Sequence, residues 1–286
     1  MMRVLVTGVT GQLGYDCVRE LERRGLEARG VSSCNFSLTD PVEMRKYMEE
    51  YRPDAVIHCA AYTAVDKAEE ETEYCEAINA EGTRLLAELC RELDCKMLYI
   101  STDYVFPGDG ARYYEPEDRK APCNAYGRSK LHGEEAVREL LEKYFIVRIS
   151  WVFGINGKNF IRTMLKLAES HKELTVVDDQ VGSPTYTRDL AVLLADMVQS
   201  DKYGVYHATN EGICSWAELA AEIFRLAGKA VKVTPVPSSA YPTKAVRPKN
   251  SRMSKATLEK AGFKRLPQWQ DAVKRYIKEL KENKTI

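Results

Sequence analysis

The sequence lacks the features that mark a membrane protein or a nucleic-acid-binding protein. Its 286 residues contain no apolar run near the roughly 18 residues that a membrane-spanning helix needs. Lysine plus arginine equals aspartate plus glutamate at 42 each, so no net charge draws the chain toward nucleic acid or anionic lipid. We therefore expect a small molecule as partner, with no nucleic acid and no membrane.

Metal-binding and redox motifs are also missing. The eight cysteines are scattered without a Cys-x-x-Cys pair, and the four histidines are isolated from one another. We expect reduced thiols and no metal site. Met1 and Met2 lead directly into a strand pattern without the apolar stretch of a signal peptide, which predicts a cytoplasmic location.

Strand and helix patterns alternate along the first half of the chain. Short apolar runs near residues 3–7, 26–31, 54–59, 97–100 and 145–150 are separated by helical patterns. This alternation predicts an α/β fold with a doubly wound parallel sheet. Later elements are shorter, which predicts a dinucleotide-binding domain over 1–150 and a smaller C-terminal α/β substrate domain over 151–286. Part of about 174–207 is expected to return to the main sheet.

A glycine-rich turn follows the first strand and precedes a helix that extends to about Arg24. Gly8, Gly11 and Gly14 form the pattern G-x-x-G-x-x-G. In this context the pattern predicts a Rossmann-type dinucleotide site, in which glycines permit close backbone approach and the helix N-terminus receives the pyrophosphate. The alternative is a glycine-rich turn without a ligand.

The end of the second strand bears on the choice of cofactor. NAD-selective sites usually place an acidic residue there to hold the ribose 2′-hydroxyl. This chain has Ser32 and Ser33 instead, so no carboxylate repels a 2′-phosphate. We expect NADPH as the cofactor, with NADH as the alternative.

Tyr126 and Lys130 form the candidate catalytic pair. On a helix their side chains lie one turn apart on the same face, and an ammonium near the phenol is expected to lower the tyrosine pKa. Thr102 ends a predicted parallel strand, so its hydroxyl is expected in the same cleft. The alternative is that the lysine stem simply packs against the ring.

Trp151 and Arg247 leave two interpretations open. Trp151 follows a strand and is either a core residue or an aromatic wall for a flat or sugar-like group. Arg247 could meet a diphosphate, although a solvated arginine is the commoner case.

The sequence resembles the extended short-chain dehydrogenase/reductases, and within them the dTDP-4-dehydrorhamnose reductases. The resemblance spans nearly the whole chain. It is carried by residues 10–14 (TGQLG), 61–69 (AYTAVDKAE), 101–106 (STDYVF), 179–185 (DQVGSPT), 239–243 (SAYPT) and 247–252 (RPKNSR), together with Tyr126 and Lys130.

This resemblance implies reduction of the 4-keto group of dTDP-4-dehydro-6-deoxy-L-mannose to dTDP-L-rhamnose. Tyr126 would protonate the forming alkoxide, Lys130 would bind the nicotinamide ribose, and Thr102 would bond the reacting oxygen. The implied cofactor contacts are Gly8, Gly11, Gln12, Leu13, Ser37, Leu38, Ala61, Tyr62 and Thr63, and the end of the second strand adds Ser32 and Ser33. The implied substrate contacts are Thr102, Asp103, Trp151, Arg247 and Asn250.

Some members of this family form dimers through magnesium held by glutamates. Asp16 and Arg188 occupy two of those places here, so we expect a monomer or a weak homodimer without a linking metal.

Several rival functions share the fold. A nucleotide-sugar 4,6-dehydratase needs an Asp-Glu pair after the threonine, whereas this chain has Asp103 and Tyr104. Another nucleotide-sugar reductase, an epimerase, and a non-catalytic regulatory subunit like that of methionine adenosyltransferase remain alternatives.

Overall fold

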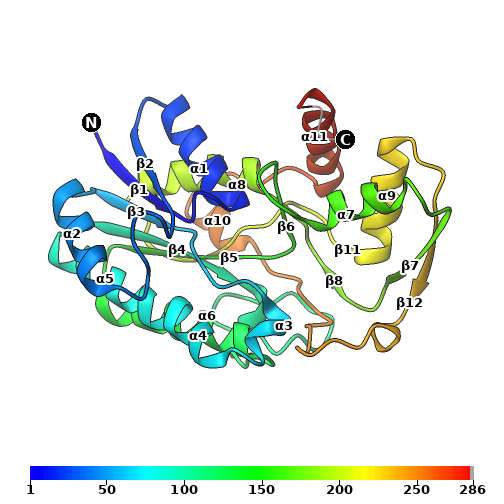
Figure 1. The fold of residues 1–286 in the computed structure, drawn as a ribbon, viewed down its shortest axis with the longest axis horizontal. Coiled ribbons are helices and arrows are strands. Elements are labelled where there is room, and N and C mark those ends of the chain that lie inside the picture. The colour runs from blue at the N-terminus through cyan, green and yellow to red at the C-terminus, as the bar shows by residue number, and fades with distance from the viewer. Residues whose placement is uncertain (284–286) are drawn as a thin grey trace.

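A six-stranded parallel sheet forms the centre of the larger lobe. The computed structural model describes residues 1–283, and the sheet lies on the left in Figure 1. The strands run in the order β10-β5-β4-β3-β1-β2, and every neighbouring pair is parallel. Their bounds are β1 Arg3–Thr7, β2 Glu27–Val31, β3 Ala55–His58, β4 Lys96–Thr102, β5 Tyr144–Ile149 and β10 Gly204–His207.

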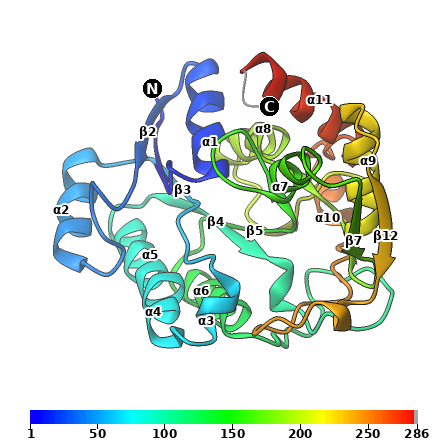
Figure 2. The same cartoon turned by 45° about the vertical axis from the view of Figure 1, so that its right-hand side comes forward.

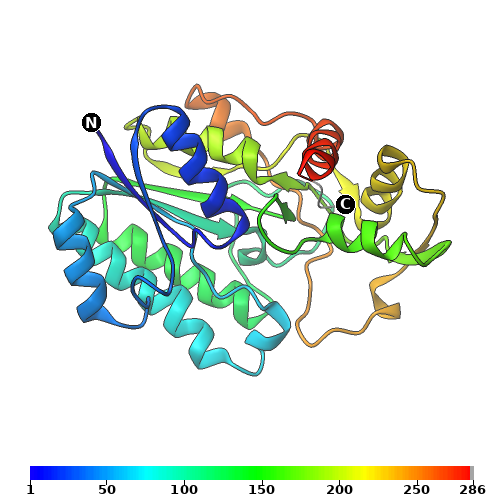
Figure 3. The same cartoon turned by 45° about the horizontal axis from the view of Figure 1, so that its top comes forward.

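Helices cover both faces of this sheet (Figures 2 and 3). One layer contains α1 Gln12–Arg23, α8 Thr187–Val198 and α10 Ala256–Lys260, and the other contains α2 Pro41–Tyr51, α5 Gly82–Glu92 and α6 Ala125–Leu140. Because successive strand residues point to opposite faces, Val4 and Val6 pack in the core with α1 and α8. Leu5 between them packs in the core with α2 and α5. The predicted doubly wound sheet is confirmed.

A chain of short helices carries the sequence from β3 to α5. It consists of α3 Val65–Ala68, α4 Thr72–Glu76 and the π-helical turn η1 Ala77–Glu81. Within η1, the Asn79 side chain accepts from Tyr62 N at 2.8 Å and donates to Tyr62 O at 3.0 Å. It also donates to Ser129 Oγ on α6 at 2.9 Å. Asn79 therefore ties the segment after β3 to α6.

A buried ion pair joins α6 to β5. The Arg148 guanidinium donates to the Glu134 carboxylate at 2.8 and 2.6 Å, and the two side chains are 0% and 1% exposed. Arg148 also donates to Pro116 O at 2.9 Å, and Ser101 Oγ donates to Glu134 at 2.6 Å. These contacts hold the end of β4, the loop after it and α6 together.

The smaller lobe has a core of its own. Phe153, Tyr186, Phe224 and Tyr276 are among its buried side chains. Its helices are α7 Phe160–Leu167, α9 Trp216–Ala227 and α11 Trp269–Glu282, and its strands are β6 Val152–Phe153, β7 Glu173–Val177, β8 Val181–Gly182, β9 Thr185–Tyr186, β11 Cys214–Ser215 and β12 Lys232–Val236. Two short 3₁₀ turns, η2 Asp103–Val105 and η3 Ser238–Ala240, lie in loops.

Local helix signals agree well with the structure. Asp40 caps α2 by accepting from Val42 N and Glu43 N at 3.0 Å, and Pro41 is the first helical residue, an arrangement that the Asp-Pro pair favours. Helix α7 ends at Leu167. Beyond it, the backbone bonds of residues 169 and 170 reach back only three residues, so the last turn is not α-helical.

Candidate active site

The glycine turn lies at the carboxyl end of β1, where α1 begins. Gly8 has a φ of 71°, and a Cβ there would lie 2.7 Å from Ala60 N. A side chain at this position would therefore clash with the backbone after β3. Helix α1 begins at Gln12, and its first residues line the adjoining cavity, so the unpaired N–H groups of the helix N-terminus lie beside this space.

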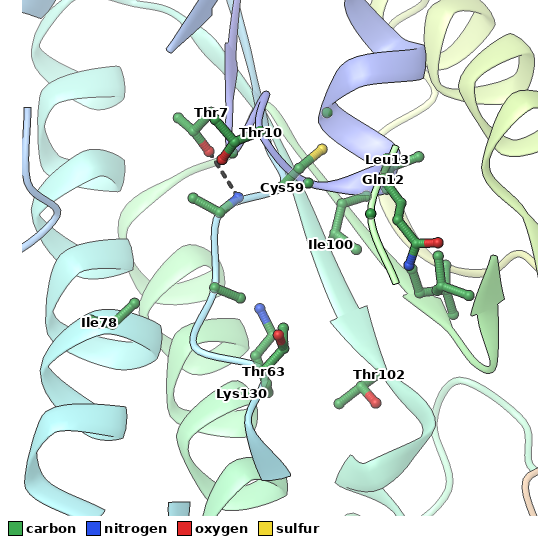
Figure 4. Close-up of a pocket in the computed structure, with 18 of the residues that line it drawn as sticks. Thr7, Thr10, Gln12, Leu13, Cys59, Thr63, Ile78, Ile100, Thr102 and Lys130 are labelled. Carbon is green, nitrogen blue, oxygen red and sulfur yellow. Dashed lines mark hydrogen bonds between the residues drawn. The ribbon is translucent and has the colours of Figure 1, made fainter. Parts of the chain in front are cut away.

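This cavity has a volume of about 690 Å³. Its lining includes almost every cofactor position predicted from the sequence, namely Gly8, Gly11, Gln12, Leu13, Ser32, Ser33, Ser37, Leu38, Ala61, Thr63, Tyr126 and Lys130. Tyr62 is the exception, because its phenol is turned to Glu71 and does not line the cavity. Figure 4 shows Thr10, Gln12, Leu13, Thr63, Thr102 and Lys130 around the same space.

The charge of the lining suits an anionic cofactor. Among the described residues that line this cavity, Asp103 is the only carboxylate, while Lys130 and Lys158 supply positive charge. At the end of β2, Ser32 N donates to Asn35 Oδ1 at 2.9 Å, so a turn of polar, uncharged residues follows the strand. The lining therefore fits a phosphorylated dinucleotide.

The catalytic candidates converge at the opposite end of the cavity. Tyr126 and Lys130 lie on the first turns of α6, whose N-cap Asn124 accepts from Gly127 N at 2.7 Å. Thr102 is the last residue of β4 and is buried. All three side chains line the cavity, so the structure brings the predicted triad together.

The predicted acidification of Tyr126 is wrong for this structure. Burial raises the pKa of Tyr126, and the Thr102 hydroxyl only partly opposes this effect. Burial also lowers the pKa of Lys130 to about 7, although Glu134 opposes it. The Lys130 ammonium stands 4.0 Å from the centre of the Tyr99 ring. Desolvation of both groups therefore outweighs their mutual influence.

Asp103 and Thr102 form a small hydrogen-bonded group beside Tyr126. Burial raises the pKa of Asp103 to about 6, against hydrogen bonds from Ser251 and Thr102 that lower it. Thr102 Oγ1 donates to Asp103 Oδ1 at 3.1 Å and accepts from Tyr104 N at 3.2 Å. The Thr102 hydroxyl must therefore exchange its bond to Asp103 in order to donate to a substrate oxygen.

A second cavity of about 920 Å³ opens toward the smaller lobe. Its lining is largely aromatic and aliphatic and includes Phe160, Met164, Leu174 and Trp216. Trp151 and Tyr104 border both cavities, so the two spaces meet at these side chains.

Trp151 packs on the core of the smaller lobe and also lines both cavities. Its indole stacks on Trp216 with ring centres 3.8 Å apart, and it packs against the core of the smaller lobe. The residue is only half-buried and forms a wall between the two cavities. Its backbone has a φ of 50°, a strained value for a bulky side chain.

The two remaining substrate candidates differ in their positions. Arg247 lines the second cavity, where its guanidinium forms a bidentate ion pair with the Asp66 carboxylate, with N···O distances of 3.0 and 2.7 Å. Asn250 is 1% exposed and lines neither cavity. Its amide donates to Asp109 O at 3.0 Å and to Arg112 O at 2.8 Å. The structure therefore places Arg247 in the lining of the second cavity. The Asn250 side chain is instead bonded to the neighbouring loop.

Residues 2–282 match the protein family described as RmlD substrate binding domain. The chain belongs to this family.

Named relatives of this RmlD-family chain include two full-length matches. It is 40% identical over 279 residues to the spore coat polysaccharide biosynthesis protein SpsK of Bacillus subtilis, with 98% of each chain covered. It is 39% identical over 293 residues to dTDP-4-dehydrorhamnose reductase of Escherichia coli, again with 98% of each chain covered.

A solved structure agrees closely with the fold of this RmlD-family chain. The dTDP-4-dehydrorhamnose reductase of Bacillus anthracis, determined in complex with NADP, superposes with a TM-score of 0.95. The two sequences are 41% identical, with 98% of this chain and 100% of that chain covered. The sequence-based assignment to this group is confirmed.

The sequence interpretation missed several lining residues of this RmlD-family site. Asn156, Gly157 and Lys158 border the first cavity from the loop after β6. The Gly157-Lys158 pair shortly after a strand end could have pointed to an anion-facing loop. Asp66 was named only as part of a motif, and nothing in the sequence pattern indicated that it holds Arg247.

Proposed function

We propose that this RmlD-family chain reduces the 4-keto group of dTDP-4-dehydro-6-deoxy-L-mannose to give dTDP-L-rhamnose, with NADPH as reductant. The observation that carries the proposal is the convergence of Tyr126, Lys130 and Thr102 in a cavity bounded by the glycine turn. The 39% identity to the Escherichia coli reductase over nearly the whole chain supports this choice among the nucleotide-sugar enzymes that share the fold.

NADPH fits the residues of the first cavity. Gly8 leaves room for a phosphate against the backbone, the N-terminus of α1 offers N–H groups, and Ser32 and Ser33 leave space for a 2′-phosphate. When bound, this cofactor supplies the hydride that reduces the carbonyl carbon. NADH would occupy the same space without the 2′-phosphate contact.

The proton for the new hydroxyl is assigned to Tyr126. A phenol with a raised pKa holds its proton until negative charge develops on the sugar oxygen, and it then donates that proton. Lys130 is assigned to the nicotinamide ribose, and its positive charge would stabilise the phenolate that remains. Thr102 and Asp103 are assigned to the reacting end of the sugar.

The nucleotide part of the substrate is assigned to the second cavity. Trp151 and Trp216 provide an aromatic surface for flat groups, and Arg247 provides charge for the diphosphate. We therefore propose that residues 1–150 form the dinucleotide-binding domain and that 151–286 mainly form the substrate domain. Within the second range, β10 belongs to the main sheet, and α8 and α10 pack on it.

The assembly and location are part of the same proposal. None of the helices within residues 1–283 is long and apolar enough to cross a membrane. Arg188 lies 3.7 Å from the Glu279 carboxylate, and Arg19 lies 3.6 Å from Asp16, so these acidic groups face arginines of their own chain. We propose a cytoplasmic monomer or weak homodimer, which sedimentation with and without magnesium would test.

A direct assay tests the function. Purified protein should oxidise NADPH, followed at 340 nm, when dTDP-4-dehydro-6-deoxy-L-mannose is supplied, and NADH should be compared in parallel. Tyr126→Phe should lower the rate by about 10²–10⁴ while NADPH affinity stays within a few-fold. Tyr104 is the matched control, because the centre of its ring lies 5.6 Å from that of Tyr126. The variant Tyr104→Phe should lose far less activity than Tyr126→Phe.

Other outcomes of this assay would contradict the proposal. Full activity of Tyr126→Phe would remove this tyrosine as the acid. Protein that retains NAD through purification and consumes no NADPH would favour an epimerase. Binding of NADPH without turnover of any nucleotide sugar would favour a regulatory subunit.

A further inference from the structure

The Gln12 side chain links the glycine turn to the smaller lobe. Gln12 is the first residue of α1 and lines the dinucleotide cavity. Its Oε1 accepts from Gly154 N at 2.8 Å and from Asn159 Nδ2 at 2.9 Å. Gly154 directly follows β6, and Asn159 is the N-cap of α7. One amide oxygen therefore joins the start of α1 to the end of β6 and the start of α7.

The same loop makes a second contact with the turn. Asn156 Nδ2 donates to Thr10 O at 3.0 Å and to Gly11 O at 3.3 Å. The loop is thus bonded to the backbone that borders the proposed pyrophosphate position. These bonds connect the loop to the backbone that a bound phosphate would contact.

β6 connects this loop to Trp151, which separates the two cavities. Only β6 lies between Trp151 and Gly154, and the strained backbone of Trp151 is held by Thr185 N, which donates to its carbonyl oxygen at 3.1 Å. The indole borders the nucleotide cavity as well as the dinucleotide cavity. The position of this wall therefore depends on segments that Gln12 anchors.

We propose that Gln12 is a positioning residue that couples dinucleotide binding in the first cavity to nucleotide binding in the second. This inference rests on the proposed function, because it assigns the substrate nucleotide to the second cavity. A dinucleotide phosphate orders the N-terminus of α1, Gln12 then fixes the loop after β6, and Trp151 presents its face to the nucleotide.

The test uses dTDP as the probe, titrated by calorimetry with and without saturating NADP⁺. Because dTDP has no hexose, it cannot touch the nicotinamide, and coupling must pass through the protein. Wild-type protein should bind dTDP about fivefold or more tightly when NADP⁺ is bound, and dTDP should tighten NADP⁺ by the same factor. Gln12→Met removes the acceptor, so the factor should fall to about one.

A conservative control separates positioning from simple cofactor contact. Gln12→Glu keeps an oxygen acceptor for Gly154 and Asn159, so it should keep the coupling factor even if its charge weakens NADP⁺ binding. If Gln12 only contacted the cofactor, both variants would weaken NADP⁺ and neither would change the coupling.

The outcomes distinguish this inference from the proposed function. Wild-type protein that binds both ligands independently would overturn the inference alone, as would undiminished coupling in Gln12→Met. Wild-type protein that binds NADP⁺ but not dTDP would overturn the proposed function and this inference with it.

Discussion

Replacing Glu134 by glutamine should destabilise the protein strongly with little change in shape. Glutamine can still accept from Ser101 and Arg148, but the guanidinium is left as an uncompensated charge at 0% exposure. Removing one partner of a buried ion pair costs about 3–5 kcal/mol. With an unfolding entropy of about 2.1 cal/mol/K per residue, this corresponds to a fall in Tm of about 5–8 °C for a chain of 286 residues.

The stability lost in Glu134→Gln should depend on pH in a definite direction. Burial alone would raise the pKa of Glu134, but its bonds to Arg148 hold that pKa below the ordinary value. The stabilisation by the carboxylate is therefore complete above an unfolded pKa of about 4.3 and is lost as pH falls through the lower folded value. The difference in Tm between wild type and Glu134→Gln should shrink below about pH 4.

Thermal melts followed by circular dichroism would measure both effects. Glu135→Gln, at the next and exposed position of α6, is the matched control and should change stability by less than about 0.5 kcal/mol. The double variant Glu134→Leu with Arg148→Met should lose less than the sum of the single losses. A Glu134→Gln variant that melts within about 1 °C of wild type at pH 7 would refute the reasoning.

Three further predictions concern the site. Because burial lowers the pKa of Lys130 to about 7, its positive charge is lost as pH rises through 7, so NADPH affinity should fall there. Fluorescence titrations should lose this step in Lys130→Met, and an unchanged step would contradict the assignment. Ser32→Asp should raise the KM for NADPH about tenfold or more and leave the KM for NADH nearly unchanged, because a contact between like charges costs about 1–4 kcal/mol at 4 Å. Equal effects on the two KM values would exclude a 2′-phosphate near Ser32. Asp66→Ala should free the segment held by Arg247, so trypsin should cut faster after Lys244 than in wild type; an unchanged cleavage rate would mean that the ion pair does not restrain this segment.

The sequence contained enough to predict a cavity beside the glycine turn. A strand followed by Gly8, Gly11 and Gly14 specifies a turn and a helix start that the structure reproduces. Tyr126 and Lys130 are four residues apart, so a helix alone brings both to one cavity. These predictions succeeded because each depends on local periodicity and backbone sterics.

Features that depend on contacts distant in sequence were not predictable. Asp66 and Arg247 are 181 residues apart, and their pairing follows only from how the two lobes pack. Asn250 looked like a nucleotide ligand but satisfies two carbonyls of a loop instead. The pKa of Tyr126 was misjudged because spacing reports the neighbouring charge but not the depth of burial.

The position of β10 has a consequence for biosynthesis. β10 is an edge strand of the sheet and pairs with β5, yet it follows β5 by roughly 55 residues in the chain. During translation at about 5–20 residues per second, the edge of β5 that later pairs with β10 stays unpaired for about 3–11 s. The free N–H and C=O groups of an unpaired strand edge can pair with other polypeptides. A nascent chain stalled in this interval, or a fragment cut after residue 150, should therefore depend on chaperones to avoid aggregation.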